Sequence, residues 1–81
     1  MSTMAQWKKM YAELSRWRDD LLLSDSQGDE IIRAIEDRIR TEKDKKAIHF
    51  LKSTLADVHS EQGNEAASDA LHRELLHHQR D

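Results

Sequence analysis

The stretch Ala5–Leu23, AQWKKMYAELSRWRDDLLL, decides the fold, because it holds three of the four aromatic residues of the chain. On a helix that turns 100° per residue, its large apolar side chains share one side and its charged residues fall elsewhere. This apolar stripe consists of Trp7, Met10, Leu14, Trp17 and Leu21, with Tyr11 at its edge. We predict an amphipathic helix over about residues 4–23, capped by Ser2 or Thr3, with a face too aromatic to leave in water.

The composition indicates a single small helical domain over residues 1–81, with a frayed polar tail at 77–81. The chain has no proline and two glycines, 37% of it is apolar and 36% is charged, which is typical of an all-α protein. A net charge of −3 argues against bulk attraction to nucleic acid or to an anionic membrane. No cysteine is present, and no apolar run approaches membrane-spanning length. We therefore expect a cytoplasmic protein.

Polar residues end the first helix at residues 24–28, where Gly28 admits a positive φ. A second helix is expected from Asp29, and two readings of residues 29–61 compete. One helix can continue throughout, since no glycine or proline interrupts it. Alternatively the helix breaks near Thr41, with Thr41 and Asp44 forming a capping box for the next helix. We favour the break, because the apolar stripes before and after it point in different directions.

Two further helices complete the expected bundle. The third helix has an apolar face of Ala47, Phe50, Leu51, Leu55 and Val58. Gly63 is placed to end it, and Asn64 to cap the fourth. The fourth helix turns Ala67, Ala70, Leu71 and Leu75 inward. The predicted fold is all-α: a bundle of three to four helices arranged as two helical hairpins, which we expect to self-associate.

The two glycine turns resemble each other. Gln27-Gly28-Asp29-Glu30 and Gln62-Gly63-Asn64-Glu65 lie 35 residues apart, a spacing typical of helical-hairpin repeats. The second unit, LADVHSEQGNEAASDALHREL, resembles a tetratricopeptide hairpin. Such hairpins present a groove to a peptide or partner protein, which is the function that the resemblance implies. The alternative is two unrelated turns that share glycine because glycine ends helices.

The aromatic face is the candidate interaction site, since tryptophan and tyrosine dominate interface hot spots. The residues that we predict for partner binding or self-association are Trp7, Met10, Tyr11, Leu14, Trp17, Arg18 and Leu21. Arg18 stands out because it lies within the apolar stripe. Its stem can cover the core while its head reaches water. Otherwise it forms an ion pair across an interface, with Glu30, Glu36 or Asp37 as candidate partners.

A basic stretch supports a second hypothesis. Residues 38–52 contain Arg38, Arg40, Lys43, Lys45 and Lys46, which could contact phosphates in a nucleic-acid-associated regulator that dimerises through the first helix. Between Arg38 and Lys46 there is no aromatic residue that could stack on bases. The alternative is a solvated helix face with pairs such as Glu42–Lys46.

The sequence gives little support for a catalytic or metal-binding site. No two of the five histidines have the i,i+4 or i,i+3 spacing of helical metal ligands. No cysteine, GxSxG, phosphate loop or HExxH motif is present. We predict no enzymatic activity, no cofactor and no metal. The expected function is protein–protein interaction, as a dimeric cytoplasmic adaptor, chaperone or inhibitor of the kind that bacteria and phages encode. It would occlude a larger partner, and the acidic balance suits a basic partner surface.

Overall fold

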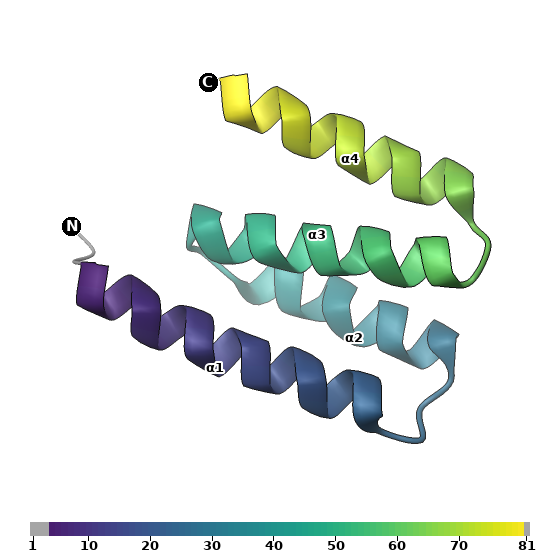
Figure 1. The fold of residues 1–81 in the computed structure, drawn as a ribbon, viewed down its shortest axis with the longest axis horizontal. Coiled ribbons are helices and arrows are strands. Elements are labelled where there is room, and N and C mark those ends of the chain that lie inside the picture. Colours follow the sequence, from purple (N-terminus) through teal and green to yellow (C-terminus); the bar gives the residue numbers. More distant parts are fainter. Residues whose placement is uncertain (1–3, 81) are drawn as a thin grey trace.

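The computed structural model describes the backbone of residues 4–80 and the side chains of residues 5–76. This part of the chain forms four helices and no strand (Figure 1): α1 (Met4–Leu23), α2 (Gly28–Thr41), α3 (Lys45–Glu61) and α4 (Glu65–Arg80). The prediction of a small all-α bundle is confirmed. The predicted caps Ser2 and Thr3, and the side chains of the predicted polar tail, lie outside the described residues.

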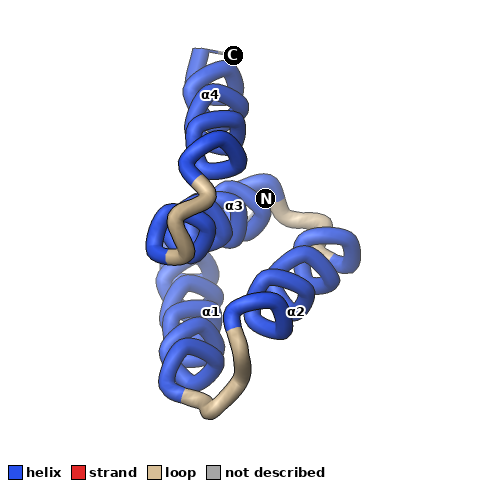
Figure 2. The backbone as a smooth tube through the Cα atoms, turned by 90° about the vertical axis from the view of Figure 1, so that its right-hand side faces the viewer, coloured by secondary structure: helices blue, strands red, loops and turns tan. Residues whose placement is uncertain are grey.

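The centre of the bundle is α3. Helices α1 and α4 lie on either side of it, and α2 packs behind the pair formed by α1 and α3 (Figures 1 and 2). The molecule is flat, with principal extents of 38 × 31 × 17 Å, so its shortest dimension is less than two helix diameters of roughly 10 Å. The chain is therefore organised around α3, and the aromatic helix α1 is an outer helix.

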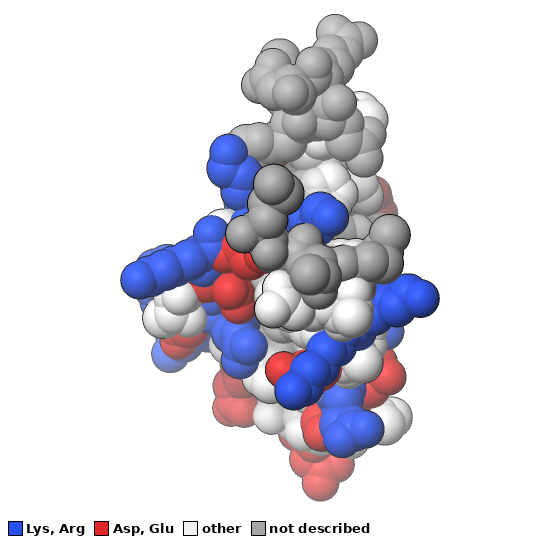
Figure 3. Space-filling view, turned by 90° about the vertical axis from the view of Figure 1, so that its left-hand side faces the viewer, with Lys and Arg blue, Asp and Glu red and all other residues white. Residues whose placement is uncertain are grey.

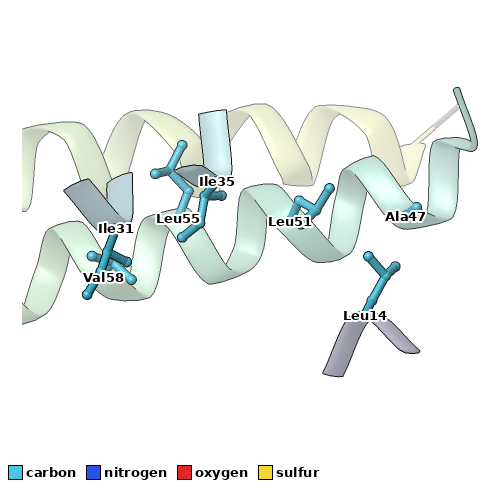
Figure 4. Packing of buried hydrophobic residues seen from close by; sticks show 7 residues of the cluster. All are labelled: Leu14, Ile31, Ile35, Ala47, Leu51, Leu55 and Val58. Atoms are coloured by element: carbon cyan, nitrogen blue, oxygen red, sulfur yellow. The ribbon is translucent and has the colours of Figure 1, made fainter. Parts of the chain in front are cut away.

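The buried core follows α3 (Figure 4). Its members are Leu14, Ile31, Ile35, Ala47, Leu51, Leu55 and Val58. Four of these come from α3, and Leu14 is the single contribution of α1. Ala56, on the side of α3 opposite Ala47, is fully buried as well, and so is Ser68 of α4. Their small side chains let α4 approach α3 closely. The prediction that Ala70 points inward is wrong, because Ser68 is buried and Ala70 is exposed.

The break between α2 and α3 is confirmed, but its cap differs from the predicted one. The Asp44 side chain accepts hydrogen bonds from the backbone N–H groups of Lys46 and Ala47, at 2.8 and 3.2 Å. Asp44 is thus itself the N-cap of α3, satisfying two amides that the first turn leaves unpaired. Thr41 is the last residue of α2, and its hydroxyl donates to the carbonyl oxygen of Arg38. The predicted capping box is wrong.

The turn from α3 to α4 follows the prediction. Gly63 has φ = 80°, a conformation that costs a residue with a Cβ roughly 1–2 kcal/mol. The N–H of Asn64 donates to the carbonyl of His59 at 2.9 Å, and that of Gly63 to Ser60 at 3.0 Å. This pair of bonds is a Schellman motif. Asn64 then caps α4 by accepting from the N–H of Ala67.

The other glycine, Gly28, occupies its position for a different reason. Gly28 is the first residue of α2, and within the described residues only Gly63 has a positive φ, so the conformational reason predicted for Gly28 is wrong. Instead, the side-chain amide of Gln62 occupies the space that a Cβ at position 28 would fill. The α3–α4 turn therefore lies against the start of α2, and the two Gln-Gly sequences meet at one end of the bundle.

Candidate functional site

Helix α1 turns its apolar stripe toward α3, yet only one residue of the stripe is fully buried. Leu14 is 1% exposed and belongs to the core, so a partner can reach it only if α1 moves. Met10, Trp17 and Leu21 pack against the core while remaining partly exposed. The face that the sequence predicts for binding is thus divided between a core-facing strip and a surface strip.

The surface strip forms a cluster with α3 that we call the aromatic patch: Trp7, Tyr11 and Arg18 of α1 with Lys46 and Phe50 of α3. Tyr11 stands edge-on to both other rings, with ring centroids 5.8 Å from Trp7 and 5.2 Å from Phe50. The Arg18 guanidinium lies 5.1 Å from the centroid of Phe50, and the Lys46 ammonium 5.4 Å from that of Trp7. These are the preferred geometries of aromatic pairs and of cations over rings.

The patch remains open to solvent. Tyr11 is 46% exposed, and Trp7, Arg18 and Phe50 are half-buried. Phe50 was expected in the core face of α3 and is missing from the predicted binding residues. It lies on the flank of α3 beside α1, and only the packing of the two helices reveals this. Because edge-to-face contacts hold the rings in place, the patch is already organised before any partner binds.

Arg18 makes its ion pair locally. Its guanidinium lies 3.2 Å from the carboxylate of Asp19, and within the described residues it makes no ion pair with any of the three predicted acidic partners. The guanidinium lies over the ring of Phe50 in α3, and the side chain is 32% exposed. The ion pair across an interface stays a prediction, since it requires a partner.

The basic cluster lies where α2 ends and α3 begins, at the end of the bundle seen in Figure 3. Arg38 pairs with Glu42 at 3.7 Å and stacks over Trp17 at 5.5 Å, and Arg40 pairs with Asp37. The predicted Glu42–Lys46 pair is wrong, because Glu42 precedes α3 and Lys46 lies over Trp7. Lys43 and Lys45 are exposed beside them.

Metal-ligating side chains do not gather in the part of the chain that the structure describes. Among the described residues, no group of three His, Asp or Glu side chains is placed to hold a metal ion. Glu74 and His78 have the i,i+4 spacing of helical ligands, but the side chain of His78 lies outside the described residues and Glu74 pairs with Lys52. None of the described helices is long and apolar enough to cross a membrane.

Comparison with family models, with curated proteins and with solved structures gave no match to this chain. The resemblance to a tetratricopeptide hairpin therefore stays a prediction.

Proposed function

We propose that this protein is a non-enzymatic interaction module, a small cytoplasmic adaptor, chaperone or inhibitor that binds and occludes a larger protein through the aromatic patch. The observation that carries the proposal is the arrangement of Trp7, Tyr11 and Phe50. Tyr11 is held edge-on to both other rings at the surface, and aromatic side chains bury much apolar area when a partner covers them. Rigid rings lose little conformational entropy on binding.

The chemistry of the patch indicates what would bind it. Two cations, Arg18 and Lys46, lie over its rings, and the basic cluster is nearby. A partner segment that fills the patch would therefore carry apolar side chains flanked by carboxylates, because these would pair with the two cations. The net negative charge of the chain pointed to a basic partner, but the charge surrounding the patch favours an acidic one.

The test compares two exposed positions on the same helix. The Tyr11→Ala variant removes the central ring of the patch, whereas Leu23→Ala removes a side chain that is 84% exposed and outside it. Proteins captured from the source cell by the immobilised wild-type chain are identified by mass spectrometry and titrated against both variants. We expect Tyr11→Ala to weaken binding at least about tenfold, a loss typical of hot spots, and Leu23→Ala to bind like the wild type. Equal binding by both variants would contradict the proposal.

A second function rests on the collection of basic residues at one end of the bundle. In this alternative, Arg38, Arg40, Lys43, Lys45 and Lys46 contact the phosphates of a nucleic acid. Its test is the affinity for generic duplex DNA as a function of salt, since phosphate contacts make binding fall steeply with salt concentration. The absence of binding at low salt would exclude this alternative.

A further inference from the structure

The side of α1 turned away from the aromatic patch carries a shallow open hollow, lined by Lys9, Ala12, Glu13, Arg16, Trp17 and Asp20. Trp17 also packs against the core, so the hollow reaches from the exposed side of α1 to the edge of its core-facing side. All six residues belong to one helix, and they centre nearly 180° around α1 from the aromatic patch at 100° per residue. Among the lining residues, Trp17 has the largest side chain and Ala12 the smallest. The four charged members lie outside the apolar stripe of the helix.

These six residues are self-complementary when the helix is reversed. A second α1 placed antiparallel, with a two-fold axis between residues 14 and 15, sets each member of the group opposite another member. Lys9 then faces Asp20, and Glu13 faces Arg16. Trp17, the largest side chain of the group, faces Ala12, the smallest. Each contact occurs twice, as an isologous two-fold interface requires.

The charges of the hollow are free to make these contacts. Lys9, Glu13, Arg16 and Asp20 are exposed, and none of them has an ion-pair partner among the described residues. At i,i+4 spacing Lys9 precedes Glu13 and Arg16 precedes Asp20, which is the less favourable order for pairs within one helix. Parallel pairing would set like charges opposite each other, and only the antiparallel arrangement joins opposite charges.

Basic and acidic residues are also segregated between the two ends of the whole molecule. When each helix is divided at its midpoint, the described half that contains the α2–α3 loop carries nine Lys and Arg against six Asp and Glu. The other described half carries three against nine. Helix dipoles account for part of this segregation, since α2 begins with Asp29 and Glu30 and ends with Arg38 and Arg40. They do not account for α3, which begins with Lys45-Lys46 and ends at Glu61. An antiparallel pair sets the basic half of one copy beside the acidic half of the other.

From these observations we infer that two copies of this chain pair through the side of α1 that carries the hollow, antiparallel about a two-fold axis, with Trp17 of each copy over Ala12 of the other. The pairing leaves the aromatic patches of both copies uncovered. It is therefore independent of the proposed partner binding, and either one can fail without the other.

Charge-swap variants of the full chain test the pairing by sedimentation equilibrium at low salt. E13R/D20K makes the hollow all basic, and K9E/R16E makes it all acidic. We expect the wild type to dimerise, each variant alone to associate at least about tenfold more weakly, and an equimolar mixture of the two to form a heterodimer. A wild-type chain that stays monomeric up to about 1 mM, or variants that dimerise as well as the wild type, would overturn the inference.

Two controls separate pairing from folding and from net charge. All four substituted residues are exposed, so far-ultraviolet circular dichroism should show unchanged helicity. E30K/D69K changes the net charge as much as E13R/D20K does, at exposed sites on α2 and α4, and should leave dimerisation intact. Loss of dimerisation in E30K/D69K would assign the effect to net charge and overturn the inference.

The relative orientation of the two copies is tested by attaching a spin label to the L23C variant. The introduced cysteine is the only one in the chain, so each copy carries one label. Antiparallel helices separate the two labels by about 25 Å along the axis. Parallel helices bring them to the roughly 10 Å spacing of packed helices, and that shorter distance would overturn the antiparallel assignment.

Discussion

Helices α1 and α3 show that aromatic content and burial are separate properties. Six side chains of α3 are buried, although Phe50 is its only aromatic residue. Helix α1 holds the other three aromatic residues, and among its described side chains only Leu14 is buried. The difference comes from position, because α3 is covered on several sides by the other three helices, whereas α1 has one side toward the bundle. Burial is decided by how many neighbours a helix has, and α1 has surface left for binding.

The largest effect is expected at the centre of α3. Leu51→Ala removes a side chain with no exposed surface and leaves a cavity, so the free energy of unfolding should fall by about 2–5 kcal/mol. Leu23→Ala, at the exposed end of α1, should change it by less than about 0.5 kcal/mol. Urea denaturation followed by circular dichroism measures both. Similar losses of unfolding free energy in the two variants would contradict the difference in burial between α3 and α1.

Hydrogen exchange tests the same contrast without a substitution. Because α1 is anchored by one buried side chain, we expect it to open without unfolding the rest of the bundle. The slowest amides of α1 should exchange at least about tenfold faster than those of α3, a difference of about 1.4 kcal/mol in opening free energy. The experiment is done at low protein concentration, where self-association does not protect α1. Equal protection would mean that the two helices unfold together.

The turn that brings α4 onto α3 sharpens the comparison further. Gly63→Ala places a Cβ on a residue with φ = 80° and should cost about 1 kcal/mol of stability. Gly28→Ala should be nearly neutral, since only the flexible side chain of Gln62 has to move. Thermal melts of the two variants give the difference. A larger loss at Gly28 would mean that the contact with Gln62 is rigid.

The smallest effect concerns the seam between the two helices. A double-mutant cycle with Arg18→Met and Phe50→Leu should give a coupling energy of about 0.5 kcal/mol, the value expected of a partly exposed cation over a ring. Urea denaturation of the wild type, the two single variants and the double variant supplies it. A coupling of zero would mean that apolar burial alone holds α1 against α3.

Local features of the fold were predicted well from the sequence. The extent of α1, the break before α3 and the role of Gly63 follow from signals within a few residues, namely apolar periodicity, capping side chains and glycine. The cap itself was misplaced by three residues, because Thr41 and Asp44 are both good N-cap residues and the sequence does not decide which of them the helix uses.

Features that depend on the arrangement of helices were not predicted. Periodicity shows which side of α1 is apolar, but not that α3 takes the central place. The reason for Gly28 lies in Gln62, far along the chain, and the place of Phe50 in the patch depends on how α1 crosses α3. The opposite charges of the hollow were readable in the sequence, but their meaning depends on knowing that this side of α1 faces outward.

The two tryptophans are intrinsic fluorescent probes of two different sites on α1. Trp7 lies in the aromatic patch near a lysine ammonium, and Trp17 lies at the hollow with an arginine over its ring. Indole emission responds to such local charge and to water. A Trp17→Phe chain would therefore report by fluorescence on events at the patch alone, and a Trp7→Phe chain on events at the hollow alone. The two proposed binding equilibria can then be followed separately, without attaching a dye.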